Sequence, residues 1–169
     1  MTATCFVDSN VLIYSYDSRQ PRKQQLASDL LKALWATNAA AISPQVINES
    51  LNTLLRLYRD VEPAQTTRER LRPYFGWIKS SIDEPLVRAA WLVSDRYGVS
   101  HWDGLIVAAA QRARCDVLYS EDMQAGMVFD STLRVVNPFV EGSEAPQYSV
   151  QEPAASYAGK RTTRRTTRG

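Results

Sequence analysis

Four acidic residues of this 169-residue sequence lie where their side chains could take part in chemistry. Asp8 directly follows the apolar run "CFV", and Asp122 follows "CDVLYS", also largely apolar. Glu49 and Asp103 each occur early in a predicted helix. A buried charge is costly unless it is paired, hydrogen-bonded or bound to a metal. Asp8 therefore either ends a strand in a cleft or caps the helix that follows.

These acids can meet at one edge of a sheet although they are far apart in sequence. In an open parallel α/β sheet, ligands bind outside the carboxyl ends of the strands, where the following helices begin. Two carboxylates about 5 Å apart repel by roughly 3 kcal/mol at an effective dielectric constant of about 20. A divalent cation would compensate this repulsion, and oxygen-only ligands suit Mg²⁺ or Mn²⁺. Such ions activate water and neutralise charge in phosphodiester hydrolysis.

Each acid also has a simpler explanation. Asp8 is compatible with a helix cap, and Glu49 and Asp122 are compatible with solvated surface positions. Asp103 could form a capping box with Ser100, three residues earlier. Spacing alone does not exclude four independent explanations of this kind.

The hydrophobic pattern predicts the elements that would position these acids. Apolar runs predict strands at 4–8, 39–43, 115–120 and 133–139. Helical patterns between them are predicted at 10–16 (capped by Ser9 or Asn10), 21–35, from 44 (capped by Ser43), between Pro63 and Pro73, at 85–98 and from 100. Strands that alternate with helices, without repeats, predict an α/β/α sandwich with a short, mainly parallel central sheet.

Composition separates the chain into two parts. Residues 1–140 carry 15 Lys/Arg and 15 Asp/Glu, whereas residues 154–169 carry five basic residues and no acid. The net charge of +2 gives no global field that would favour nucleic acid. Apolar periodicity stops at Glu141, so we expect one domain over 1–140 and a flexible, C-terminally basic tail over 141–169.

Cysteine and histidine usage argues against other metal sites. Cys5 and Cys115 each lie beside an apolar stretch and are expected to be buried thiols. His101 is the one histidine, which leaves little material for a zinc site or a histidine-based triad. No apolar run approaches the roughly 18 residues of a membrane span, and no signal peptide is visible, so we expect a cytoplasmic protein.

Four motifs taken together resemble the PIN-domain family, most of all the VapC-type toxins of bacterial toxin–antitoxin pairs. The resemblance covers residues 4 to about 140. The motifs are "FVDSNVLIY" (6–14), "ISPQVINE" (42–49), "HWDGLIVAAA" (101–110) and "VLYSEDMQAG…RVVNPF" (117–138).

The resemblance implies roles for residues that match the family pattern. The first-strand aspartate of the family matches Asp8, and its helical glutamate matches Glu49. Its third acid, after a tryptophan or tyrosine, matches Asp103. Its fourth acid, in a Ser/Thr-x-Asp pattern, matches Asp122, with Ser120 as the hydroxyl. The resemblance further implies a Mg²⁺- or Mn²⁺-dependent endoribonuclease, a homodimer, and inhibition by a cognate antitoxin.

We expect Asp8 and Asp103 to hold the principal metal ion, with Asp122 bound directly or through water. Glu49 would orient or deprotonate the attacking water, or hold a second ion. Asn10 and Ser120 are expected to contact the substrate.

Basic residues around an acidic site would have to hold RNA, although such residues are usually only solvated. The candidates are Arg19, Arg22 and Lys23, and a second group formed by Arg56, Arg59, Arg68, Arg70 and Arg72. The tail sequence "KRTTRR" could add salt-sensitive phosphate contacts, or could have no role.

Other classes of function fit the sequence less well. An aspartyl phosphatase needs a second carboxylate in a D-x-D pattern, where this chain has Asn10. A Rossmann nucleotide site needs a Gly-rich loop after the first strand, and none is present. The remaining alternative is a module on the same fold that binds RNA or protein without cleaving.

Overall fold

A computed structural model describes residues 4–140 of the chain. Within these residues the structure has one five-stranded sheet with the strand order β2-β1-β3-β5-β4. The strands β2, β1, β3 and β5 are parallel to one another, and β4 is antiparallel to β5. Their bounds are β1 Cys5–Val7, β2 Ala40–Ala41, β3 Val117–Tyr119, β4 Val128–Phe129 and β5 Leu133–Val136.

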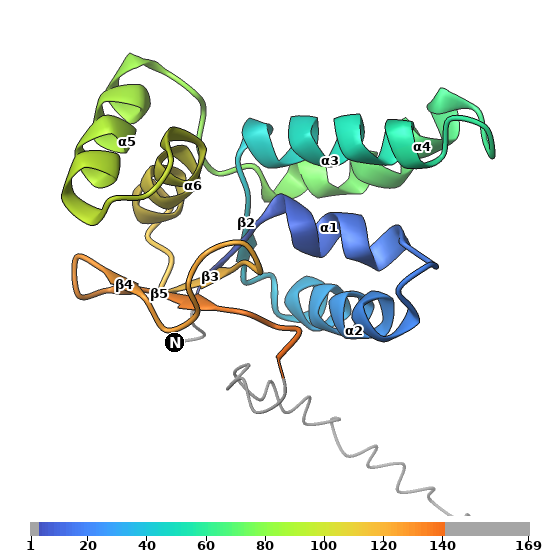
Figure 1. Ribbon diagram of the computed structural model, residues 1–169, viewed down its shortest axis with the longest axis horizontal. Helices are drawn as coiled ribbons and strands as arrows, with labels where there is room; N and C mark the ends of the chain where they lie inside the picture. The colour runs from blue at the N-terminus through green and yellow to red at the C-terminus, as the bar shows by residue number, and fades with distance from the viewer. Residues whose placement is uncertain (1–3, 141–169) are drawn as a thin grey trace, which may run out of the picture.

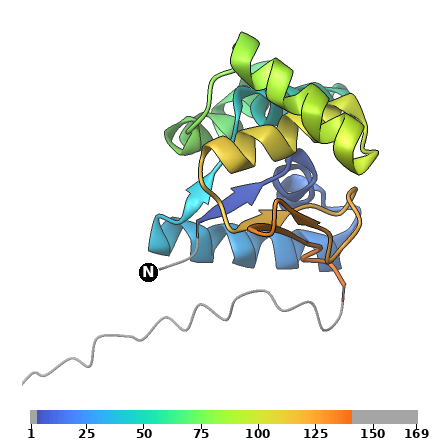
Figure 2. The ribbon, with the colours of Figure 1, turned by 90° about the vertical axis from the view of Figure 1, so that its left-hand side faces the viewer.

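Helices lie on both faces of this sheet. Figure 2 shows the sheet between α2 on one side and α5 and α6 on the other, and Figure 1 shows α1 and α3 beside it. The helices are α1 Ser9–Tyr16, α2 Pro21–Thr37, α3 Pro44–Leu57, α4 Ala64–Leu71, the 3₁₀ helix Arg72–Trp77, α5 Glu84–Tyr97 and α6 His101–Arg112. The predicted α/β/α sandwich with a short, mainly parallel sheet is therefore confirmed.

The sequence missed one strand and overestimated the lengths of the others. β4 has only two residues and pairs with β5 across a turn in which Asp130 and Ser131 both have positive φ. Two residues give too little alternation to be read as a strand. The segment between Pro63 and Pro73 forms α4 and then a 3₁₀ helix, because proline at 73 lacks the N–H that would continue the α-helical pattern.

The helix starts differ in how well the sequence predicted them. The cap of α1 is Asp8, whose side chain accepts a hydrogen bond from the Ser9 N–H; of the caps considered for this helix, Asp8 is confirmed, and Ser9 or Asn10 was wrong. Ser43 does precede α3, but its side chain makes no capping hydrogen bond. Ser100 caps α6 as predicted, by accepting from the Asp103 N–H.

α5 and α6 pack closely against each other at Gly104. A Cβ atom built on Gly104 would lie 2.5 Å from Ser94 Oγ and 2.7 Å from the Ala90 carbonyl oxygen, both in α5. A larger residue at position 104 would therefore force the two helices apart. Both predicted buried thiols, Cys5 and Cys115, lie in the core.

The predicted tail, 141–169, lies outside the described residues. No helix among the described residues is long and apolar enough to cross a membrane.

Candidate active site

Asp8 stands at the carboxyl end of β1 and at the first turn of α1, so both interpretations of its position apply at once. The residue is only 5% exposed. Its Oδ1 accepts a hydrogen bond from the Ser9 N–H at 2.7 Å, which is the cap of α1. Its Oδ2 accepts from the Ser120 hydroxyl at 2.7 Å and from the Asn10 amide at 3.3 Å.

The parallel pairing of β1 with β3 brings Ser120 to Asp8. Val7 pairs with Tyr119, and the Asp8 N–H donates to the Tyr119 carbonyl at 3.0 Å. The residues after this pair, Asp8 and Ser120, therefore leave the sheet side by side. Ser120 is fully buried, so its hydroxyl needs partners inside the protein.

Asn10 joins Asp8 to Asp122. The Asn10 Nδ2 atom lies 3.3 Å from Asp8 Oδ2 and 3.2 Å from Asp122 Oδ2, so it can donate to both carboxylates. Its Oδ1 accepts from the Glu121 N–H at 3.3 Å, which ties the loop after β3 to α1. The Asp122 N–H donates to Ser120 Oγ at 3.2 Å. Asp122 itself is exposed.

Glu49 reaches the same cluster from α3. Its Oε2 accepts from the Ser9 hydroxyl at 3.0 Å, and Ser9 also lies 3.5 Å from Asp8 Oδ1. Its Oε1 accepts from the Gln45 amide at 2.8 Å. Glu49 is half-buried rather than fully solvated, so the surface interpretation of this residue does not apply.

The surroundings of Asp8 favour its protonated form. The pKa of Asp8 is raised from 3.8 to about 6, chiefly by burial; the nearby charges of Glu49 and Asp122 also raise it, and hydrogen bonds from Ser120 and Ser9 lower it. Among residues 4–140, no cation is one of the groups that shift this pKa, and the hydrogen-bond donors to the carboxylate are neutral.

Asp103 is not hydrogen-bonded to the other three acids. Its Oδ2 accepts from the Ser100 hydroxyl at 2.8 Å, and its N–H donates back to Ser100 Oγ at 3.1 Å. The predicted capping box is therefore formed. The start of α6 still adjoins the cluster, because Gln45 Nε2 also donates to the Trp102 carbonyl at 3.3 Å.

Comparison with known proteins shows the family to which this chain belongs. The model of the PIN domain matches residues 5–126, which is most of the chain. The chain belongs to the PIN-domain family. The resemblance inferred from the four motifs is thereby confirmed for the family, and the matched residues include all four predicted acids.

A solved structure shares this fold. It is VapC20 of Mycobacterium tuberculosis, described as a toxin that cleaves the sarcin–ricin loop; it has a TM-score of 0.50 and 19% sequence identity. The match covers 70% of the present chain and 90% of the VapC20 chain. A search of curated proteins gave no match.

The donor atoms in this PIN domain suit a hard divalent cation. Asp8, Glu49 and Asp122 offer carboxylate oxygens only, and Asp8 is a buried acid beside two others. Within residues 4–140, however, no three His, Cys, Asp or Glu side chains form a group that could hold a metal ion as they stand. The acids are linked instead through the side chains of Ser9 and Asn10, which lie between them.

Several basic residues predicted to hold RNA already pair with acids. Arg19 pairs with Asp17, and Arg70 with Glu62 at 2.6 Å. Lys23 pairs with Glu121, the neighbour of Asp122. These pairs support the solvated or structural interpretation for these three basic side chains.

Sequence reasoning missed Gln45 as part of this site. The residue is buried and connects Glu49 to the main chain of Trp102. The available signal was the spacing of Gln45 and Glu49, four residues apart on one helix, which places the two side chains on the same face.

Proposed function

We propose that this PIN domain is a divalent-metal-dependent endoribonuclease and the toxin of a toxin–antitoxin pair. The observation that carries the proposal is Asp8, a buried carboxylate with two acidic neighbours and no cation among the groups that shift its pKa. Such an arrangement is costly for folding and is useful to a protein that binds a cation there. The fold shared with VapC20, a toxin that cleaves RNA, supports RNA as the substrate.

The acids that would hold Mg²⁺ or Mn²⁺ are Asp8, Asp122 and Asp103, as the family resemblance implies. A bound ion would supply water activation and charge neutralisation at the scissile phosphate. Glu49 is the acid that stands at the edge of the cluster, on a different helix from Asp8. In this proposal Glu49 is the general base: one of its carboxylate oxygens takes up the proton of the attacking water.

Asn10 and Ser120 have a positioning role in this proposal rather than the substrate contact that we expected. Their donors already serve the carboxylates of Asp8 and Asp122. Ser120 is also fully buried, which leaves its hydroxyl out of reach of RNA. Both side chains would hold the acids in the orientation that a cation requires.

The proposal extends to partners and location. We propose a cytoplasmic homodimer that a cognate antitoxin inhibits by inserting a segment into the acidic site. Sedimentation equilibrium of the purified chain tests the homodimer. One chain has a mass of 19.0 kDa, and a homodimer gives twice that value.

The decisive experiment is cleavage of total cellular RNA by the purified protein with Mn²⁺ and then with EDTA. Wild type is compared with Asp8→Asn and Asp103→Asn, and with Asp29→Asn as a control on the exposed face of α2. We expect discrete fragments from wild type and Asp29→Asn with metal only. Circular dichroism establishes that each variant is folded.

Two outcomes would contradict the proposal. Full metal-dependent cleavage by folded Asp8→Asn and Asp103→Asn would remove these acids from the site. RNA binding without cleavage, under any metal condition, would instead indicate the non-catalytic binding module.

A further inference from the structure

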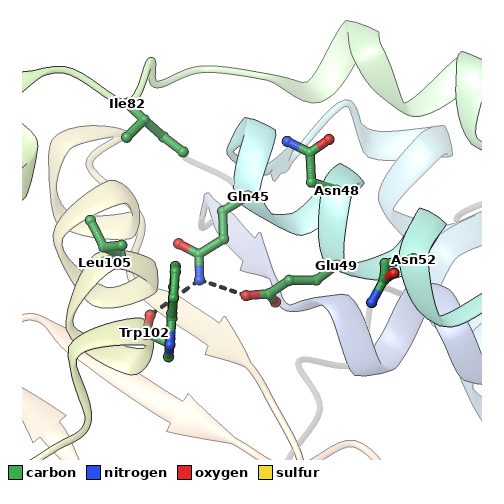
Figure 3. A pocket seen from close by; sticks show the side chains of 7 residues that line it. All are labelled: Gln45, Asn48, Glu49, Asn52, Ile82, Trp102 and Leu105. Carbon is green, nitrogen blue, oxygen red and sulfur yellow. Dashed lines mark hydrogen bonds between the residues drawn. The ribbon is translucent and has the colours of Figure 1, made fainter.

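A pocket of about 510 Å³ adjoins the acidic cluster, between α3 and the start of α6. Figure 3 shows the side chains around it and the two hydrogen bonds from Gln45, one to Glu49 on the same helix and one to the Trp102 carbonyl on the opposite wall. Its volume lies in the usual range for small-ligand sites. The lining residues are Gln45, Asn48, Glu49, Asn52, Ile82, Trp102 and Leu105.

The pocket contains a large aromatic surface that the protein does not bury. Trp102 is 64% exposed, although burial of an indole ring is strongly favourable. Leu105 and Ile82 supply further apolar lining from α6 and from the segment before α5. An exposed, flat ring in a pocket is suited to stacking against another planar group, such as a base.

The wall formed by α3 carries carboxamides. Gln45, Asn48 and Asn52 are spaced at three, four and seven residues, which places them on one face of the helix. Asn48 and Asn52 are exposed and, among residues 4–140, neither side chain makes a hydrogen bond within the protein. Each carboxamide offers a donor and an acceptor, which match the edges of a nucleobase.

The pocket and the acidic cluster share Glu49. One oxygen of Glu49 accepts from Ser9 in the cluster, and the other accepts from Gln45 in the pocket wall. Gln45 is 6% exposed and also holds the Trp102 carbonyl, so it fixes the aromatic wall relative to Glu49. A planar ligand in the pocket would therefore lie beside Glu49, which is one of the acids of the cluster.

We propose that this pocket, the base pocket, binds one unpaired nucleobase of the RNA substrate. The base stacks on Trp102, and Asn48 and Asn52 donate to and accept from its edge. The neighbouring phosphodiester then lies at the acids, so the base pocket selects where the strand is cut. This inference rests on the proposed function and adds a specificity site to it.

The test measures binding of fluorescently labelled single-stranded oligoribonucleotides, one each of A, C, G and U, by anisotropy in EDTA. The variants are Trp102→Ala and Trp102→Phe. Trp91→Ala is the matched control, because Trp91 is a 53% exposed tryptophan on α5 that does not line the pocket. Loss of a stacked base weakens binding by about tenfold in Trp102→Ala, whereas phenylalanine retains most of the affinity. Trp91→Ala binds as wild type.

A second measurement concerns the choice of base. Asn48→Ala with Asn52→Ala should reduce the difference in affinity among the four oligonucleotides, because the edge contacts that discriminate bases are gone. If Trp102→Ala binds all four as tightly as Trp91→Ala does, the base pocket is wrong, and a protein segment becomes its alternative occupant.

Because binding is measured without metal, this test is separate from that of the nuclease. Cleavage that depends on Asp8 but not on Trp102, at unchanged positions, would leave the nuclease and overturn the base pocket. Binding that depends on Trp102 in a protein that never cleaves would leave the base pocket and overturn the nuclease.

Discussion

The two ends of α1 each carry a buried aspartate, and the pKa values of the two side chains are shifted in opposite directions. Asp8 caps the N-terminus of the helix and is 5% exposed, and Asp17 caps the C-terminus and is 3% exposed. The helix dipole alone would stabilise a negative charge at Asp8 and destabilise one at Asp17.

The pKa values run against this expectation. Two hydrogen bonds from the Arg19 guanidinium, both 2.7 Å, hold the pKa of Asp17 below its usual value. Burial and two neighbouring acids raise the pKa of Asp8 to about 6. The helix dipole changes the free energy of a charge at its end by roughly 0.3–1 kcal/mol, so hydrogen-bond partners and desolvation have the larger effect on these two pKa values. One end of α1 is built for stability, and the other keeps a charge for which the described chain provides no cationic partner.

Cleavage should show the largest difference between the two ends. We expect Asp8→Asn to slow metal-dependent RNA cleavage at least about a hundredfold, because a carboxylate that would hold the cation is lost, and with it the charge neutralisation that the cation would supply. Asp17→Asn should retain most of the wild-type rate when assayed below its melting temperature. Initial rates with Mn²⁺ measure both. An equal loss in folded Asp17→Asn would mean that the two ends do not differ in function.

Stability should change in opposite directions. At pH 8, Asp8→Asn should raise the free energy of unfolding by about 2 kcal/mol, since the cost of the ionised buried carboxylate is removed. Asp17→Asn should lower it by about 1 kcal/mol, because hydrogen bonds from a charged group are weakened. Urea unfolding measures both values, and a destabilised Asp8→Asn would argue against an uncompensated charge.

The pH dependence should isolate Asp8. In the folded state Asp8 keeps its proton up to pH about 6, whereas in the unfolded chain it loses it near 3.8. Between these values the folded state binds more protons, so this group makes stability fall as pH rises. Asp17 has the opposite sign, since its contribution is lost as pH falls.

The measured quantity is the free energy of unfolding of wild type minus that of Asp8→Asn, from pH 4 to pH 8. This difference should decline with rising pH and level off above pH 6. A flat difference would contradict the raised pKa of Asp8.

Metal binding should change stability by less than the substitution Asp8→Asn does. At Mn²⁺ concentrations about tenfold above the dissociation constant, wild type should gain about 1.4 kcal/mol of stability and melt a few degrees higher. Asp17→Asn should respond in the same way, and Asp8→Asn should respond weakly. Calcium at equal concentration controls for ionic strength. No response in wild type would count against a metal site.

The sequence predicted the elements better than the contacts between their ends. Buried runs such as Cys5–Val7 and the alternation with helices sufficed for the sheet, because these patterns are local. The sequence left the cap of α1 open among Asp8, Ser9 and Asn10, because all three are good caps and only the fold decides among them.

The candidate site was predictable as a set of elements that end at one edge. The hydrogen bonds that link the acids were not predictable, because they depend on the pairing of β1 with β3 and on how α3 packs against α1. Ser9, Asn10 and Ser120 become bridges only once that register is set. For Asp103 the local sequence pattern was the better guide: both of its hydrogen bonds are to Ser100, as the capping box predicts, and neither is to another acid, as its role in the family would suggest.

The close contact at Gly104 joins one wall of the base pocket to α5. Because no side chain separates the two helices at Gly104, α6 lies directly against the backbone of α5 there, and Trp102 is at the start of α6. The carboxamides and Glu49 belong to α3, on the other side of the base pocket. The base pocket therefore lies between α3 and the packed pair of α5 and α6, so a molecule bound in it would bridge the helix that carries Glu49 and the helix that carries Asp103.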